Sequence, residues 1–217
     1  MEQAEWLGLV EELKVRHGCH TLILYGSRAH GTETAASDID IVCFRAEGEA
    51  ISDCRRWGEY WLDAWINPEQ MAEKPQDFLH LDGGRVLAEA EGFGARLLAD
   101  IAGILAQPWP GLREDERRHR RVWLQKTLAR IRRGDPEAWY RRHSLVVELL
   151  ENAVELRGQR FMGFKRSLRW IQDHDPELYA QFVRLYSAEA DLELIEQMVN
   201  VVIGYDDLDS FQPEGLQ

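Results

Sequence analysis

A short segment with two prolines and a glycine, Gln107-Pro108-Trp109-Pro110-Gly111, divides this chain of 217 residues into halves with different patterns. Neither a helix nor a strand continues easily through such a segment, because proline lacks a backbone donor and fixes φ. Before it, short apolar runs alternate with helical stretches. After it, apolar residues recur at the spacing of three or four that is typical of helices. We therefore expect an α/β domain over residues 1–108 and a helical bundle over residues 112–217.

Three segments of the first half have the pattern of strands. The run 21–25 is apolar and ends at a glycine, 38–44 starts with alternation and becomes wholly apolar, and 60–66 alternates throughout. Asn67-Pro68-Glu69 then has the pattern of a helix start, with asparagine as the cap and proline in the first turn. Further expected elements are a helix over 2–17, a strand over 84–88 and helices over 93–106, 113–133, 136–157, 165–172, 176–186 and 188–203.

The distribution of charge limits the classes of partner. A net charge of −12 argues against indiscriminate binding to nucleic acid, because affinity for the phosphate backbone depends on a cationic surface. Basic residues nevertheless gather in residues 113–133, where nine Lys and Arg stand against three Asp and Glu. We expect this basic segment to be a solvated helix face with ion pairs. The alternative is a surface for triphosphate, RNA or another partner.

The cysteines and histidines do not form a zinc motif. Cys19, Cys43 and Cys54 lack the short paired spacing of zinc or redox sites, and the seven histidines include no His-Glu-x-x-His pattern. Plain thiols of this kind fit a reducing compartment.

No apolar run reaches the length of a membrane helix, and the N-terminal residues lack the pattern of a secretion signal. We expect a cytoplasmic protein without a membrane partner.

Gly26 and Ser27 directly follow the first expected strand and precede a short expected helix. Backbone N–H groups, a hydroxyl and a helix N-terminus meet there, and these groups suit phosphate oxygens. A side chain at Gly26 would hold a phosphate away from the backbone. The segment is not a P-loop, because Thr32 follows Gly31 where that motif requires lysine. We expect Gly26, Ser27 and Arg28 to bind the phosphates of a nucleotide.

Asp38 and Asp40 begin the second expected strand, eleven and thirteen positions after Ser27. Residues at i and i+2 of a strand project from the same face, and two close carboxylates repel each other unless a cation lies between them. Oxygen ligands of this kind favour Mg²⁺ or Mn²⁺ over zinc. Asp63 is the expected third carboxylate because it lies inside a strand; Asp53 and Glu59 are the alternatives. Three carboxylates can hold two metal ions beside a transferring phosphate.

These residues resemble the DNA polymerase beta-like nucleotidyltransferase superfamily. Its hallmark is Gly-Ser, a short spacer, Asp-x-Asp and a later single acid, which match Gly26-Ser27, Asp38-Ile39-Asp40 and Asp63 over about residues 21 to 66. The resemblance implies a mixed sheet with flanking helices, followed here by a helical bundle. It also implies Mg²⁺ or Mn²⁺ and a nucleoside triphosphate, for which ATP is the expected donor.

The arrangement of the whole chain resembles the aminoglycoside and related small-molecule nucleotidyltransferases. In that group the second domain helps to bind the triphosphate and the acceptor. The resemblance implies that Lys165, which follows Gly163 and Phe164, contacts the triphosphate. It also implies a general base in the second domain, and Glu148 is our choice over Glu151 and Glu155 on the same expected helix.

The sequence leaves the acceptor open. We expect transfer of a nucleoside monophosphate to a hydroxyl of a small molecule such as an aminoglycoside-like antibiotic. One alternative is an enzyme that modifies protein or tRNA, in a toxin–antitoxin setting. Another is a nucleotide-binding regulator with a degenerate site, against which the intact carboxylates argue. A homodimer is also left open.

The tryptophans at 57, 61 and 65 fit a core or a pocket wall, with stacking of a nucleobase as the alternative.

Overall fold

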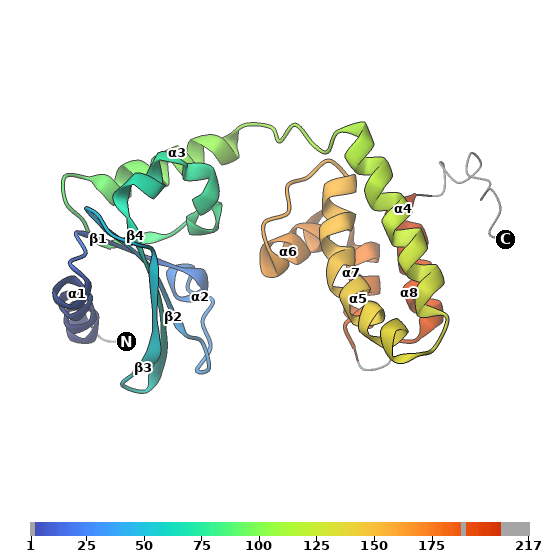
Figure 1. The fold of residues 1–217 in the computed structure, drawn as a ribbon, viewed down its shortest axis with the longest axis horizontal. Helices are drawn as coiled ribbons and strands as arrows, with labels where there is room; N and C mark the ends of the chain where they lie inside the picture. The colour runs from blue at the N-terminus through green and yellow to red at the C-terminus, as the bar shows by residue number, and fades with distance from the viewer. Residues whose placement is uncertain (1–2, 188–189, 205–217) are drawn as a thin grey trace. The chain divides into compact units, whose positions relative to one another are not determined.

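The computed structural model describes residues 3–187 and 190–204 (Figure 1). The backbone forms two compact units, Met1–Pro108 and Trp109–Gln217, which are described separately. The first unit contains five strands with helices around them, and the described part of the second contains helices α4 to α8. A mixed sheet with flanking helices, followed by helices, confirms the predicted fold class. No helix among the described residues is both long and apolar enough to cross a membrane.

The sheet of the first unit has the strand order β3-β4-β2-β1-β5. Strand β2 pairs with β4 in parallel, whereas the β1–β2, β1–β5 and β3–β4 pairs are antiparallel. The two strands expected to carry carboxylates, β2 and β4, are therefore direct neighbours in the middle of the sheet. The bounds are β1 Thr21–Tyr25, β2 Ile39–Arg45, β3 Ile51–Trp57, β4 Tyr60–Pro68 and β5 Arg85–Ala88.

Each face of the sheet packs against a different helix, as Figure 1 shows. Helix α1, Gln3–His17, buries Leu9, Val10 and Leu13 against one face. Helix α3, Phe93–Ala106, and the 3-10 segment η2, Pro75–Leu81, cover part of the other face. That second core includes Ile23, Val42, Phe44, Phe78, Leu81, Leu97 and Ile101.

The structure adds one strand that the sequence analysis did not predict. Strand β3 lies at the edge of the sheet and forms a hairpin with β4, in which Trp57 pairs with Tyr60. Its charged residues are typical of an edge strand, where charge discourages pairing with another chain, but they conceal the apolar alternation of a strand.

The predicted helix cap at Asn67 is wrong. Strand β4 continues through Asn67 to Pro68, and the following 3-10 segment η1, Glu69–Glu73, has Pro68 as its N-cap without a side-chain cap. Asn67 pairs in register with Phe44 of β2, so pairing with the neighbouring strand prevails over the local capping preference. The side chain of Asn67 is consequently not used as a cap.

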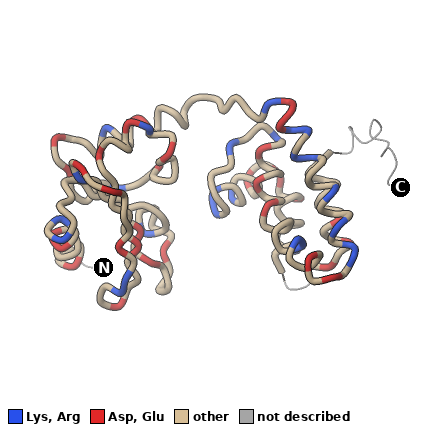
Figure 2. The backbone as a smooth tube through the Cα atoms, in the orientation of Figure 1, with Lys and Arg blue, Asp and Glu red and all other residues tan. Residues whose placement is uncertain are grey.

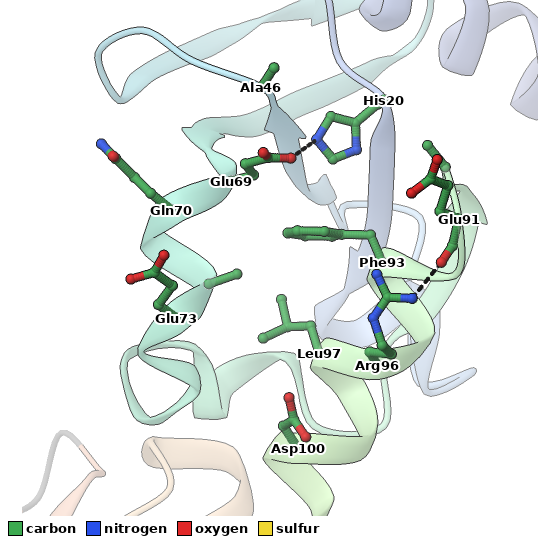
Figure 3. A pocket seen from close by; sticks show the side chains of 12 residues that line it. His20, Ala46, Glu69, Gln70, Glu73, Glu91, Phe93, Arg96, Leu97 and Asp100 are labelled. Carbon is green, nitrogen blue, oxygen red and sulfur yellow. Dashed lines mark hydrogen bonds and ion pairs between the residues drawn. The ribbon is translucent and has the colours of Figure 1, made fainter.

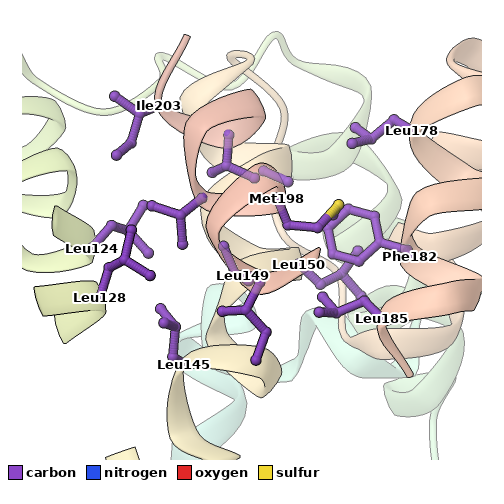
Figure 4. Close-up of a cluster of buried hydrophobic side chains, with 14 of the residues drawn as sticks. Leu124, Leu128, Leu145, Leu149, Leu150, Leu178, Phe182, Leu185, Met198 and Ile203 are labelled. Atoms are coloured by element: carbon purple, nitrogen blue, oxygen red, sulfur yellow. The ribbon is translucent and has the colours of Figure 1, made fainter. Parts of the chain in front are cut away.

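The second unit is held together by one apolar core (Figure 4). Asp135, Asp175 and Asp191 each accept a hydrogen bond from a backbone N–H in the first turn of the next helix, and proline follows the first two. Side chains such as Leu149, Phe182 and Met198 are fully buried between the helices. The helices are α4 Glu114–Ile131, α5 Pro136–Leu156, α6 Phe164–His174, α7 Pro176–Leu185 and α8 Leu192–Ile203. The expected start of the last helix, at residues 188 and 189, lies outside the described residues.

Candidate active site

Gly26 and Ser27 begin a four-residue helix, α2, Gly26–Ala29, directly after the buried strand β1. Gly26 has a φ of +68°, which few residues with a side chain adopt. The Nδ1 atom of His30 lies 2.6 Å from the carbonyl oxygen of Gly26 and closes the turn. The turn has the local structure that the sequence predicts, and phosphate binding by Gly26 and Ser27 stays a prediction.

Arg28 holds the segment that leads to the carboxylates. Its Nε donates to the carbonyl oxygen of Asp38 at 2.7 Å, and its Nη2 donates to that of Ser37 at 2.6 Å. Its guanidinium also lies 4.7 Å from the centre of the Tyr60 ring. The observed contacts therefore give Arg28 a role in positioning Asp38, whereas its contact with phosphate stays a prediction.

A row of four polar side chains crosses the sheet near one end of its strands. Tyr25 pairs in register with Asp40, Asp40 with Asp63, and Asp63 with Cys54. Residues paired in this way project from the same face, and neighbouring strands are about 4.8 Å apart. Asp38 stands two positions before Asp40, just ahead of β2. The fold thus brings together the three carboxylates that the sequence analysis selected.

The lack of a side chain at Gly26 makes room for Asp40. A Cβ atom built on Gly26 would lie 2.2 Å from Oδ2 of Asp40 and 3.0 Å from its Cγ. The separation of 2.2 Å is shorter than any contact that packed atoms tolerate, so the carboxylate of Asp40 would have to move. Glycine is therefore required here both by the backbone conformation and by the carboxylate beside it.

The pKa of Tyr25 reflects the negative charge on this face of the sheet. Burial raises the pKa of Tyr25, and the negative charges of Asp40, Asp63 and Asp38 raise it further. Each of the three carboxylates is therefore close enough to act on one phenol. Its ring also packs edge-on against His80, with 5.2 Å between the ring centres.

Asp63 is held by a thiol. The Sγ of Cys54 donates a hydrogen bond to Oδ1 of Asp63 at 2.9 Å, and this bond is the main reason why the pKa of Cys54 is raised. In this conformation, no three His, Cys, Asp or Glu side chains among the described residues are grouped so that they could hold a metal ion. One oxygen of Asp63 is turned to Cys54, and carboxylates without a cation between them repel each other.

The carboxylates nevertheless have the chemistry that a hard cation requires. They offer oxygen atoms only, two of them stand on paired neighbouring strands, and one of them, Asp40, lies directly beside the turn at Gly26. Asp38, Asp40 and Asp63 would hold Mg²⁺ or Mn²⁺ here, with phosphate oxygens completing the coordination.

The two alternatives for the third carboxylate lie elsewhere. Asp53 pairs in register with Ala64, on the sheet face that α1 covers, and accepts hydrogen bonds from His17 and Arg55. Glu59 is exposed in the turn between β3 and β4. Asp63 is therefore the alternative that shares a face with Asp40.

The two remaining predicted residues belong to the second unit. Glu148 lies on α5, where burial and the nearby Glu151 raise its pKa. Lys165 is exposed in the first turn of α6, next to Arg166. Their roles toward a triphosphate and an acceptor stay predictions.

One large cavity lies away from the carboxylates. It has a volume of about 810 Å³ and is lined by residues such as His20, Glu69, Phe93 and Arg96 (Figure 3). His20 directly precedes β1, and Ala46, which also lines the cavity, directly follows β2. The cavity is therefore at the opposite end of these strands from Asp40.

A smaller recess of about 200 Å³ lies on the carboxylate face. The recess and the contacts of Tyr25 and Cys54 with the carboxylates could not be predicted from the sequence. The alternation in β4, which places Trp65 on the same face as Asp63, was the one sequence signal for this recess. Tyr25, Val42, Trp65, Asn67, Phe78 and His80 line it.

Comparisons with known proteins bear on the first unit. A solved structure titled as a nucleotidyltransferase-like protein from Exiguobacterium sibiricum 255-15 aligns with 92% of this chain and 72% of its own, at 14% identity and a TM-score of 0.44. None of the curated proteins compared with the chain matches it. Residues 8–83 match the family model described as a nucleotidyltransferase domain, and this segment includes Gly26, Ser27 and all three carboxylates. Residues 8–83 are therefore similar to a nucleotidyltransferase domain, in agreement with the resemblance that the Gly-Ser and Asp-x-Asp motifs indicate.

Proposed function

We propose that this protein transfers a nucleoside monophosphate from a nucleoside triphosphate, with ATP as the donor, to a hydroxyl of a small molecule. The observation that carries the proposal is the pairing of Asp40 with Asp63 on neighbouring strands, beside the turn at Gly26. Carboxylates so close to a glycine turn suit a metal-bound triphosphate.

The chemistry is a substitution at the α-phosphorus. The acceptor oxygen forms a bond to that phosphorus, the bond to the bridging oxygen breaks, pyrophosphate leaves, and the hydroxyl proton passes to a base. Bound Mg²⁺ or Mn²⁺ would supply positive charge against the phosphates. Gly26 and Ser27 position the phosphates through backbone N–H groups, and Asp38, Asp40 and Asp63 hold the metal.

Two residues of the second unit are proposed to act in the same reaction. Glu148 is the proposed base, and its raised pKa supports this role because a carboxylate with a higher pKa accepts a proton more readily. Lys165 is the proposed contact to the triphosphate, and its exposure in the first turn of α6 leaves the ammonium group accessible.

The contacts of the basic helix favour a small acceptor over RNA. Figure 2 shows Lys and Arg along α4. However, Arg120 pairs with Glu151 and Glu155 of α5, and Arg117 donates to the carbonyl oxygen of Leu156. These two arginines hold α4 against α5, so they are poorly placed to neutralise the phosphates of RNA.

The proposal is tested by measuring pyrophosphate release with each of the four triphosphates and Mg²⁺. The acceptors are a panel of hydroxylated small molecules that includes aminoglycosides, and, in separate reactions, tRNA and protein fractions. We expect release with ATP and a small molecule, and its loss in Asp38→Asn. Release that depends only on tRNA or on protein would assign the acceptor to that class. The absence of release with every combination would contradict the proposal.

A further inference from the structure

The recess next to the carboxylates is lined mainly by aromatic side chains. Tyr25, Trp65, Phe78 and His80 give it aromatic sides, and Val42 contributes an aliphatic one. Burial lowers the pKa of His80, which favours the neutral form of its ring. Its volume of about 200 Å³ is below the roughly 300–1,000 Å³ of pockets that enclose a whole drug-sized ligand. The recess therefore suits one neutral flat ring rather than an entire multi-ring molecule or an amine.

Asn67 supplies the recess with hydrogen-bonding capacity that the protein does not use. The residue is only 7% exposed, and its side-chain amide forms no hydrogen bond with another residue in the described ranges. The polar atoms of this amide are not fully enclosed, so water in the recess can reach them, and a ligand that bonds to them takes the place of that water. The amide offers both a donor and an acceptor. Its natural partner is a ring edge that offers the complementary pair, as a nucleobase does.

The position of the recess along the strands indicates whether it lies on the side of the acceptor or on the side of the departing pyrophosphate. Val42 and Trp65 pair in register, each two residues beyond Asp40 and Asp63, which is roughly 7 Å along the strands. Gly26 lies on the opposite side of the carboxylate row, because β1 is antiparallel to β2. In an in-line substitution the acceptor and the departing pyrophosphate lie on opposite sides of the phosphorus. If the pyrophosphate lies at Gly26, the acceptor enters from the side of the recess.

We propose that this recess is the acceptor subsite and that it receives a neutral nucleobase-like ring. The inference rests on the proposed nucleotidyl transfer. The sugar of a nucleoside is bonded directly to its base, so a base between Trp65 and His80 brings the sugar hydroxyls toward Asp63. Stacking on the aromatic walls provides affinity, and Asn67 selects the ring edge.

Calorimetry tests this without turnover. Adenosine, guanosine, cytidine and uridine are each titrated into protein saturated with Mg²⁺ and α,β-methylene-ATP. These nucleosides lack phosphates, so they cannot use the glycine turn. We expect at least one to bind to the loaded protein. The same ring could belong to the donor; in that case the nucleoside and the ATP analogue would compete, and competition would overturn the acceptor assignment.

Variants locate the binding. Trp65→Ala removes one wall at a half-exposed position, and we expect about fivefold to 150-fold weaker nucleoside binding. Trp65→Phe keeps an aromatic wall and should retain most of the affinity, which separates stacking from misfolding. Asn67→Leu removes donor and acceptor and should reduce the preference among the four bases. Trp61→Ala is the matched control, because Trp61 is an exposed tryptophan on the same face and strand outside the recess.

Two results would overturn the inference while the proposed function stands: the loaded protein binds no nucleoside, or Trp61→Ala weakens binding as much as Trp65→Ala. Failure of the ATP analogue itself to bind with Mg²⁺ would instead contradict the proposed function, and the inference with it.

Discussion

Gly26 shows most directly how one residue shapes the site. Gly26→Ala would add the cost of a left-handed alanine, roughly 1–2 kcal/mol, and would push the new Cβ into the carboxylate of Asp40. We expect this variant to lose Mg²⁺-dependent binding of ATP in calorimetry. Gly18→Ala is the control, since Gly18 has a φ of +67° and no atom within 4 Å of the added Cβ. Equal loss of binding in both variants would mean that backbone strain, rather than the carboxylate, is responsible.

We expect the thiol of Cys54 to compete with a metal ion for Asp63, because its hydrogen bond occupies one oxygen of the carboxylate. Cys54→Ala should therefore lower the Mg²⁺ concentration that gives half-maximal binding of an ATP analogue. The expected decrease is about two- to tenfold, which corresponds to the net free energy of one hydrogen bond. Cys54→Ser keeps a donor and should resemble the wild type. A higher Mg²⁺ requirement in the alanine variant would show that the thiol supports the site.

The proximity of Asp38 and Asp40 could be predicted from the sequence, but the partners of the carboxylates could not. Asp38 and Asp40 lie two residues apart in one segment, so their shared face follows from local strand geometry. The contacts of Asp63 with Cys54, and of Tyr25 with Asp40, depend on strand register across the sheet. Register is set by nonlocal packing and by turn geometry, so no local pattern discloses it.

At the scale of elements, β3 is attached to α1 by charges rather than by a large apolar surface. Asp53 accepts hydrogen bonds from His17 at 2.9 Å and from Arg55 at 3.0 Å. Arg55 also pairs with Glu12 of α1, which accepts a further bond from Trp57. Hydrophobic periodicity does not detect a strand that is fixed in this way, which explains why β3 escaped prediction.

This attachment predicts a pH dependence. Burial alone would raise the pKa of Asp53, but the hydrogen bonds from His17 and Arg16 and the charge of Arg55 outweigh it and lower the pKa. A lowered folded-state pKa stabilises the protein above the unfolded-state value of about 3.9, and this stability is lost as the pH falls through the folded-state pKa. Asp53→Asn should cost about 1–3 kcal/mol at pH 7 in urea unfolding. The difference from the wild type should vanish in strong acid; a constant difference would contradict the ionic account.

At the scale of the molecule, each unit has its own core. The structure divides into its two units after Pro108, and in the sequence two prolines and a glycine interrupt both kinds of periodicity at residues 107–111. Phe182→Ala empties a fully buried position of the second unit, and we expect a loss of about 3–5 kcal/mol. Hydrogen exchange should then accelerate in α5, α7 and α8 while β1, β2 and β4 keep their protection. Accelerated exchange in both units would show that they unfold together.

The central claim is that Asp40, beside Asp63 and Gly26, holds a metal against a triphosphate. It is tested most directly by calorimetric titration of α,β-methylene-ATP into the wild type and Asp40→Asn, with and without Mg²⁺. The substitution keeps the shape and removes the charge, and Asp53→Asn makes the same change on the opposite face of the sheet. We predict that wild-type and Asp53→Asn proteins bind the analogue only with Mg²⁺, and that Asp40→Asn binds at least about tenfold more weakly, or ~1.4 kcal/mol, while remaining folded. Binding by Asp40→Asn as tight as that of the wild type, or wild-type binding that does not depend on Mg²⁺, would contradict the account.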